Sequence, residues 1–168
     1  MIGRLHTGLA FVAGLGVAWA CSAVAACGGD ERCGPSSGTV VRTIDGDTVE
    51  LASGERVRYL MIDTPETTGG KNDCFGAEAS DFNRDAVEGR EITLSYDEVC
   101  EDDYGRLLAY VSVGGREMNA LMVERGYACV LQIPPNGEGR ADEFDDLEYT
   151  ARTNMIGVWG ACEEVTCD

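Results

Sequence analysis

Three short strand-like runs separated by turn signals constrain the fold of this chain more than any other feature. The runs cover residues 39–44, 48–52 and 56–62, and Asp45-Gly46 and Ser53-Gly54 stand between them. Such pairs between runs of this length favour tight reversals between antiparallel strands. The pattern therefore predicts a three-stranded meander.

The third run carries an arginine among apolar residues. By the two-residue period of a strand, Arg58 shares a face with Leu60 and Ile62. Such an arginine is either a surface residue whose stem packs on the strand, or a guanidinium aimed at an anion near the strand's end. The pattern leaves both interpretations open.

Apolar spacing and glycine stops predict the remaining elements. They are a helix over 77–88, strands over 91–96 and 107–113, a short helix that Asn119 caps and Gly126 ends, and a helix over 141–155. Five strands and three helices in this order indicate an α+β fold. The order is compatible with a small Greek-key barrel, and other α+β folds share it.

The N-terminal segment predicts export. Residues 1–26 contain Arg4, an apolar run and then small residues, which is the order of a secretory signal peptide. Val24-Ala25-Ala26-Cys27 also resembles a bacterial lipobox, in which Cys27 becomes lipid-modified. The alternative is an ordinary cleaved signal with a secreted or periplasmic product. We expect a flexible tether over 27–37 and a C-terminal tail over 163–168.

The composition excludes several kinds of catalytic site. His6 is the only histidine and lies in the expected signal peptide, and Lys71 is the only lysine. The mature chain would therefore have no Ser-His-Asp site, no Cys-His site and no histidine-ligated zinc. Carboxylate, arginine, tyrosine and hard-metal chemistry remain.

Six cysteines follow the lipobox, and an even number in an exported chain favours disulfide bonds. A metal–thiolate site is the weaker alternative. The candidates are Cys33, Cys74, Cys100, Cys129, Cys162 and Cys167, and six cysteines allow 15 connectivities.

Three motifs supply clustered carboxylates and two arginines. They are Ile44-Asp45-Gly46-Asp47-Thr48-Val49, the segment from Arg58 to Ile62-Asp63-Thr64-Pro65-Glu66-Thr67, and Asp103-Tyr104-Gly105-Arg106. In this order they resemble the signature of the staphylococcal nuclease (thermonuclease) family. Residues 74–79, 119–128 and 157–159 extend the resemblance over residues 38–162. It implies a mainly β, α+β domain: a five-stranded OB-fold Greek-key barrel with three packed α-helices.

The resemblance implies a calcium site. It assigns Asp47, Asp63 and the backbone carbonyl of Thr64 as ligands, and calcium prefers oxygen ligands of these kinds. Pro65 restricts Thr64 to an extended conformation, which fixes the direction of that carbonyl. Taken alone, Asp-Gly-Asp is more often a turn than a metal site.

The resemblance also implies a catalytic set. Arg58 and Arg106 correspond to two phosphate-binding arginines, which can neutralise the charge that grows in the transition state. Glu66 corresponds to a glutamate that contacts the attacking water and is commonly interpreted as the general base. Tyr104 and Lys71 are the expected substrate contacts.

The implied activity is calcium-dependent hydrolysis of DNA and RNA phosphodiesters with little sequence specificity, leaving 3′-phosphorylated products. Single-stranded DNA or RNA, or a frayed duplex, would be the substrate, and no obligate protein partner is implied. The family's best-known pattern has two tyrosines where this chain has Gln132 and Pro134, which predicts weaker base stacking. The alternatives are a catalytically silent binding module and a calcium-binding surface lipoprotein, and the second leaves Arg58 and Arg106 unexplained.

The charge of the chain is unusual for a protein that binds nucleic acid. It has 30 acidic and 13 basic side chains, for a formal net charge of −17, whereas a basic face is typical of such proteins. The acidic excess is either a solvated surface or a sign that the domain no longer binds polyanions.

The resemblance also suggests how the cysteines pair. We expect Cys74–Cys100, because the neighbouring loops serve the same phosphate in the family. We expect Cys129–Cys162, because these regions lie close together in the family, and Cys33–Cys167 for the remaining pair.

Overall fold

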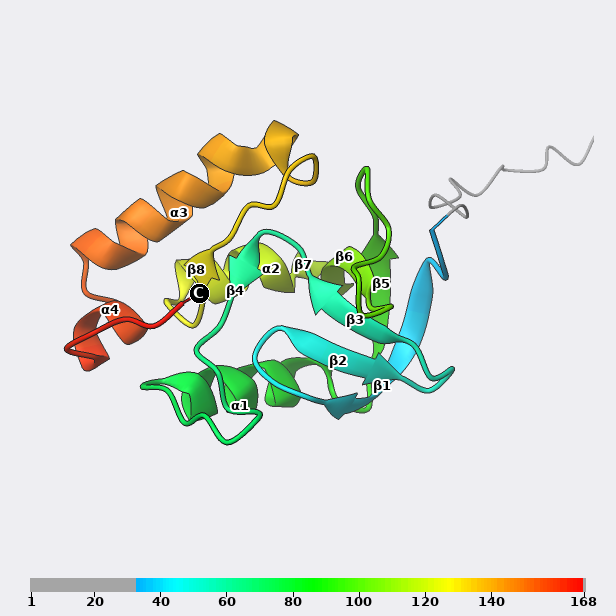
Figure 1. Ribbon diagram of the computed structural model, residues 1–168, viewed down its shortest axis with the longest axis horizontal. Coiled ribbons are helices and arrows are strands. Elements are labelled where there is room, and N and C mark those ends of the chain that lie inside the picture. The colour runs from blue at the N-terminus through cyan, green and yellow to red at the C-terminus, as the bar shows by residue number, and fades with distance from the viewer. Residues whose placement is uncertain (1–32, 168) are drawn as a thin grey trace, which may run out of the picture.

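The computed structural model describes residues 33–167 (Figure 1). The expected signal peptide and Cys27 lie outside the described residues. No helix within residues 33–167 is long and apolar enough to cross a membrane.

Short strands and helices make up the domain, and the helices are packed around the strands. The strands are β1 (Ser37–Thr43), β2 (Thr48–Leu51), β3 (Arg56–Tyr59), β4 (Ile62–Asp63), β5 (Glu91–Ser95), β6 (Leu107–Val113), β7 (Arg116–Glu117) and β8 (Cys129–Val130). The helices are α1 (Gly76–Val87), α2 (Met118–Glu124), α3 (Ala141–Thr153) and the short α4 (Val158–Ala161), and a 3₁₀ turn, η1 (Glu138–Arg140), precedes α3.

Five strands close into a barrel. Their order is β3-β2-β1-β5-β6, and β3 pairs in parallel with β6 to complete the ring. The expected meander is present, with Val49 opposite Val57 across β2 and β3. Alternate residues of these strands fill the interior: Val40, Val49, Leu51, Val57, Ile92 and Leu94 are each at most 2% exposed. This confirms the expected five-stranded barrel with three main helices.

The helices lie outside the barrel, with α1 along one side and α3 beside β8 and α2 (Figure 1). The core continues from the barrel into α2 through Met118 and Met122, and into α3 through Phe144. The two-stranded sheet of β4 and β8 joins the barrel to this helical part.

The expected third strand, residues 56–62, is interrupted. β3 ends at Tyr59, and β4 begins at Ile62 after Met61, which adopts a left-handed conformation with φ of 67°. The prediction of one continuous strand was wrong, because Ile62 leaves the barrel and pairs with Val130. The interruption turns the chain back toward Arg58.

The prediction that Asn119 caps a helix was also wrong. Helix α2 already begins at Met118, and the Asn119 side chain is fully buried. Its Oδ1 accepts a hydrogen bond from the Val111 backbone N–H (2.8 Å), and its Nδ2 donates to the Leu60 carbonyl (2.8 Å). Asn119 therefore joins α2, β6 and the turn that follows β3.

All six candidate cysteines form disulfide bonds, as expected, but the three expected pairings were wrong. The bonds are Cys33–Cys100, Cys74–Cys162 and Cys129–Cys167. The antiparallel register of β1 and β5 explains the first, because the chain before Ser37 runs beside the chain after Ser95. The other two connect the C-terminal segment to the start of α1 and to β8. Cys129–Cys167 attaches residue 167 of the expected tail to the domain, and Cys33–Cys100 attaches residue 33 of the expected tether.

Candidate functional site

Asp47 is the centre of a buried polar cluster beside the barrel. It follows the turn after β1 and is 4% exposed. Its Oδ2 accepts hydrogen bonds from the Thr64 backbone N–H (2.9 Å) and from Thr64 Oγ1 (3.1 Å). A Cβ atom at Gly46 would lie 2.7 Å from the Thr64 side chain. Glycine at position 46 therefore allows these two segments to meet.

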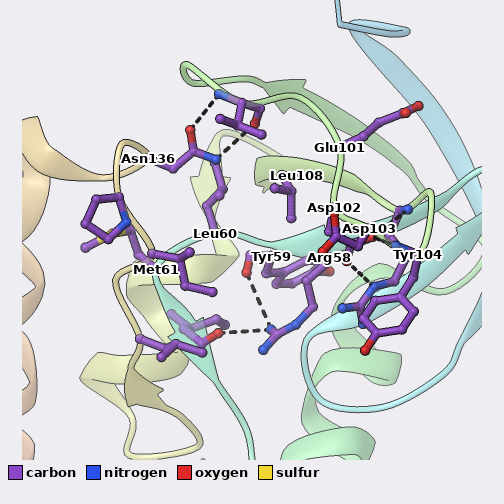
Figure 2. A pocket seen from close by; sticks show the side chains of 16 residues that line it. Arg58, Tyr59, Leu60, Met61, Glu101, Asp102, Asp103, Tyr104, Leu108 and Asn136 are labelled. Atoms are coloured by element: carbon purple, nitrogen blue, oxygen red, sulfur yellow. Dashed lines mark hydrogen bonds and ion pairs between the residues drawn. The ribbon is translucent and has the colours of Figure 1, made fainter.

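Arg58 bridges two carboxylates. Its Nη1 lies 2.6 Å from Asp47 Oδ2, and its Nη2 lies 2.7 Å from Asp63 Oδ1. Nη1 also donates a hydrogen bond to the Ile62 carbonyl (2.9 Å), which the turn at Met61 brings back toward β3 (Figure 2). The side chain is only 14% exposed. Arg58 is thus aimed at anions at the end of its strand, and these anions belong to the protein itself.

Asp45 belongs to the same cluster and was not among the expected site residues. Its Oδ1 accepts a hydrogen bond from the Asp47 backbone N–H (3.1 Å). Burial, and then the neighbouring charge of Asp47, raise the pKa of the Asp45 carboxyl above its usual range. The sequence signal that could have identified Asp45 was its position two residues before Asp47 in the first motif. The raised pKa favours the neutral form of Asp45, and Asp47 and Asp63 supply two carboxylates against the single guanidinium of Arg58.

The donor chemistry of this cluster fits a hard divalent cation. Among residues 33–167, no group of three or more His, Cys, Asp or Glu side chains is arranged to hold a metal ion. The expected site needs fewer, because it uses two carboxylates and a backbone carbonyl. Asp47 and Asp63 converge on one guanidinium, with Thr64 bonded to Asp47, so oxygen donors of the kinds that calcium prefers are gathered here.

Glu66 lies in the loop between β4 and α1. Its Oε2 accepts a hydrogen bond from Thr68 Oγ1 (2.8 Å), and the Glu66 and Asp73 backbones are joined by an Asp73 N–H to Glu66 carbonyl bond (3.0 Å). A Cβ at Gly76 would lie 2.7 Å from the Pro65 carbonyl oxygen, so the start of α1 closes tightly on this loop. The loop conformation thus fixes where the Glu66 carboxylate lies. Lys71 is exposed in the same loop.

Arg106 is held by one carboxylate at the surface. Its Nε lies 2.7 Å from Asp102 Oδ2, and Asp102 Oδ1 accepts hydrogen bonds from the backbone N–H groups of Arg106 (3.0 Å) and Tyr104 (2.9 Å). Burial raises the pKa of Asp102, but these hydrogen bonds and the Arg106 charge lower it more, so the pKa lies below its usual value. The guanidinium carbon lies 5.6 Å from the centroid of the Tyr104 ring. Asp102 therefore orients Arg106, a role that its place before the third motif did not reveal.

A cleft of about 700 Å³ joins the two arginines (Figure 2). Arg58 and Arg106 both line it, together with Tyr104, Ile133 and Pro134. The lining does not include Asp47, Asp63, Thr64 or Glu66. Asp47 and Asp63 contact Arg58, and Thr64 contacts Asp47. Lys71 and Gln132 do not line the cleft either. The structure thus brings the two arginines and Tyr104 to one cavity, and Arg58 also contacts the acidic cluster.

Asn136 fixes the wall of the cleft opposite Tyr104 (Figure 2) and was not among the expected site residues. Its Oδ1 accepts a hydrogen bond from the Val99 backbone N–H (2.8 Å), and its Nδ2 donates to the Val99 carbonyl (2.9 Å). The side chain thus pairs with Val99 as a neighbouring strand would. Gly137 N–H donates to Asp97 Oδ2 in the same two loops (2.7 Å). A lone asparagine after two prolines carries no signal for such a contact.

Comparisons with known proteins give matches over most of the chain. Residues 56–161 match the family model described as staphylococcal nuclease homologue. The chain is 34% identical over 135 residues to the SPbeta prophage-derived endonuclease YokF of Bacillus subtilis (strain 168), which covers 76% of this chain and 45% of that protein. Endonuclease YncB of the same organism is 34% identical over 135 residues, or 76% of this chain and 64% of that protein.

A thermonuclease of Staphylococcus intermedius is 33% identical over 125 residues, which covers 71% of this chain and 74% of that protein. The chain therefore spans between 45% and 64% of the length of the two Bacillus relatives and a larger share of the staphylococcal one.

Proposed function

Because the chain belongs to the staphylococcal nuclease family, we propose that it hydrolyses phosphodiester bonds in nucleic acids. The observation that carries the proposal is the position of Arg58 and Arg106 on one cleft, with the carboxylates of Asp47 and Asp63 in contact with Arg58. The family membership and the names of the endonuclease and thermonuclease relatives support it.

The two arginines bind the phosphate in the cleft that both of them line. A guanidinium donates two parallel hydrogen bonds to phosphate oxygens and neutralises the charge that develops as the phosphorus is attacked. Asp102 holds Arg106 by its Nε, so its terminal nitrogens remain for the substrate. Arg58 offers its guanidinium to phosphate oxygens once the charges of Asp47 and Asp63 are balanced by another cation.

Glu66 is the proposed general base. Its carboxylate accepts the Thr68 hydroxyl on one oxygen, which leaves the other oxygen to accept a proton from water.

Calcium is the proposed cofactor. Asp47, Asp63 and the backbone carbonyl of Thr64 would hold it, and a bound divalent cation polarises a phosphoryl oxygen and stabilises the negative charge of the transition state. The oxygen donors that converge on Arg58 support this assignment.

The product ends, the sequence preference and the location of the protein are also proposed. Family resemblance suggests 3′-phosphorylated products and little sequence preference. We further propose export and a lipid anchor on Cys27, and the three disulfide bonds support an oxidising location. A Cys27→Ala variant should leave the membrane fraction of cells that express the full chain, whereas a chain without an anchor would fractionate identically in both forms.

The activity is tested directly with purified protein. Single-stranded DNA, RNA and duplex DNA are incubated with calcium or with a chelator, and the product ends are identified by mass spectrometry. We expect calcium-dependent cleavage, with terminal 3′-phosphates, that Glu66→Gln reduces by orders of magnitude. Intact substrates under all metal conditions would instead support a silent binding module.

A further inference from the structure

The cleft beside the arginines combines exposed apolar side chains with an acidic rim. Val99, Tyr104 and Ile133 line it and are 40%, 78% and 67% exposed. Exposed apolar surface inside a cleft is typical of a binding site, and a nucleobase has the flat apolar faces that such side chains contact. The cleft therefore suits one nucleoside next to the phosphate that the arginines bind.

The charges on the rim do not suit a further phosphate. Within residues 33–167, the basic side chains that line the cleft are Arg58 and Arg106, whereas Glu101, Asp102 and Asp103 supply three carboxylates. Asp102 is paired with Arg106. Glu101 and Asp103 are exposed, and Figure 2 shows them on the side of the cleft that carries Tyr104. Two carboxylates on this side thus lack a cation among the lining residues.

We infer that Glu101 and Asp103 make this cleft selective for a nucleoside that carries no second phosphate on its outer side. The inference rests on the proposed nuclease function. A nucleoside inside a strand has a phosphate on each side, whereas a terminal nucleoside has only one. This chain therefore cleaves the linkage next to one strand end in preference to internal linkages. Glu101 and Asp103 act as specificity-determining residues.

The expected effect follows from Coulomb's law. Two unit charges about 8 Å apart in water interact by about 0.5 kcal/mol, which corresponds to roughly a two- to threefold change in rate per charge. Screening reduces the effect, since the Debye length falls from about 30 Å at 0.01 M to about 3 Å at 1 M ionic strength. The preference should therefore be strongest at low salt.

The test removes the charge from one flanking phosphate at a time. The substrates are thymidine tetranucleotides in which the first, the third or neither linkage is an uncharged methylphosphonate. Cleavage of the central linkage is followed by chromatography with calcium at low salt. For the wild type, one of the two methylphosphonates should raise kcat/KM about threefold to fivefold. This gain should disappear in the Glu101→Gln/Asp103→Asn variant and at 1 M NaCl.

The matched control is Glu124→Gln/Asp145→Asn, which removes two exposed carboxylates outside the cleft. This control variant should show the same rise in kcat/KM from the methylphosphonate as the wild type. A wild type with no gain from either methylphosphonate, or a gain that persists in Glu101→Gln/Asp103→Asn, would overturn the inference while leaving the nuclease function intact. Failure of the wild type to cleave any of the three substrates would overturn both.

Discussion

The two arginines of the cleft differ in how the protein holds them. Arg58 is 14% exposed on its side chain and contacts two carboxylates and two backbone carbonyls, whereas Arg106 is 26% exposed and contacts the single carboxylate of Asp102. Arg58 therefore contributes to the stability of the acidic cluster as well as to the cleft. Arg106 contributes only to the cleft and not to the stability of the acidic cluster. Two residues of one type, on one cavity, should then respond differently to the same substitution.

The largest effect is expected for Arg58→Ala. Loss of a transition-state contact should lower kcat/KM at least about a thousandfold. Removing one partner of a buried ion pair leaves uncompensated charge, so the free energy of unfolding in chelator should fall by about 3 kcal/mol. Hydrolysis assays and urea unfolding measure both quantities. Unchanged stability would show that the bridge to Asp47 and Asp63 contributes nothing to the fold.

Arg106→Ala should lower the rate of hydrolysis without lowering the stability of the fold. We expect kcat/KM to fall by about a hundredfold or more, with a change of less than about 1 kcal/mol in the free energy of unfolding, because an exposed ion pair contributes little. Arg125→Ala, another exposed arginine outside the cleft, is the control and should change neither. Near-wild-type hydrolysis by the Arg106 variant would remove it from the site.

A smaller effect is expected for Asp102→Asn. The variant keeps Arg106 but loses the charge that orients its guanidinium, so kcat/KM should fall by about tenfold. Combining it with Arg106→Ala should give no further loss, because Asp102 acts through Arg106. Additive losses in the double variant would show that Asp102 has a separate role.

The smallest effect concerns pH. The pKa of Asp102 is lowered in the folded protein, so its ionised form contributes stability above the ordinary aspartate pKa of about 4, and this is lost as pH falls through the folded-state value. The Tm difference between wild type and Asp102→Asn should therefore be present at pH 6 and shrink below pH 4. A difference that stays constant down to pH 2.5 would contradict this assignment.

The sequence predicted those parts of the molecule that local signals encode. Turn pairs and alternating apolar residues predicted the meander, and the three motifs predicted both arginines of the cleft. The break at Met61 was not predictable, because a methionine with positive φ is stabilised by the pairing of Ile62 with Val130.

Contacts between distant segments could not be predicted from the sequence either. The disulfide pairings depend on which loops the register of β1 and β5 brings together, and the contact of Asn136 with Val99 depends on two loops 37 residues apart. Asp102 and Asn136 orient other parts of the site without belonging to a motif that marks them.

Calcium binding tests the central claim most directly, namely that Arg58 and a cation share the carboxylates of Asp47 and Asp63 while Arg106 serves only the phosphate. Isothermal titration calorimetry measures the calcium affinity of wild type, Arg58→Ala and Arg106→Ala without substrate. In the wild type the guanidinium competes for the carboxylates. Arg58→Ala should therefore bind calcium about tenfold more tightly or better, and Arg106→Ala should bind it as the wild type does. Equal affinities in all three proteins, or no calcium binding by the wild type, would contradict the account.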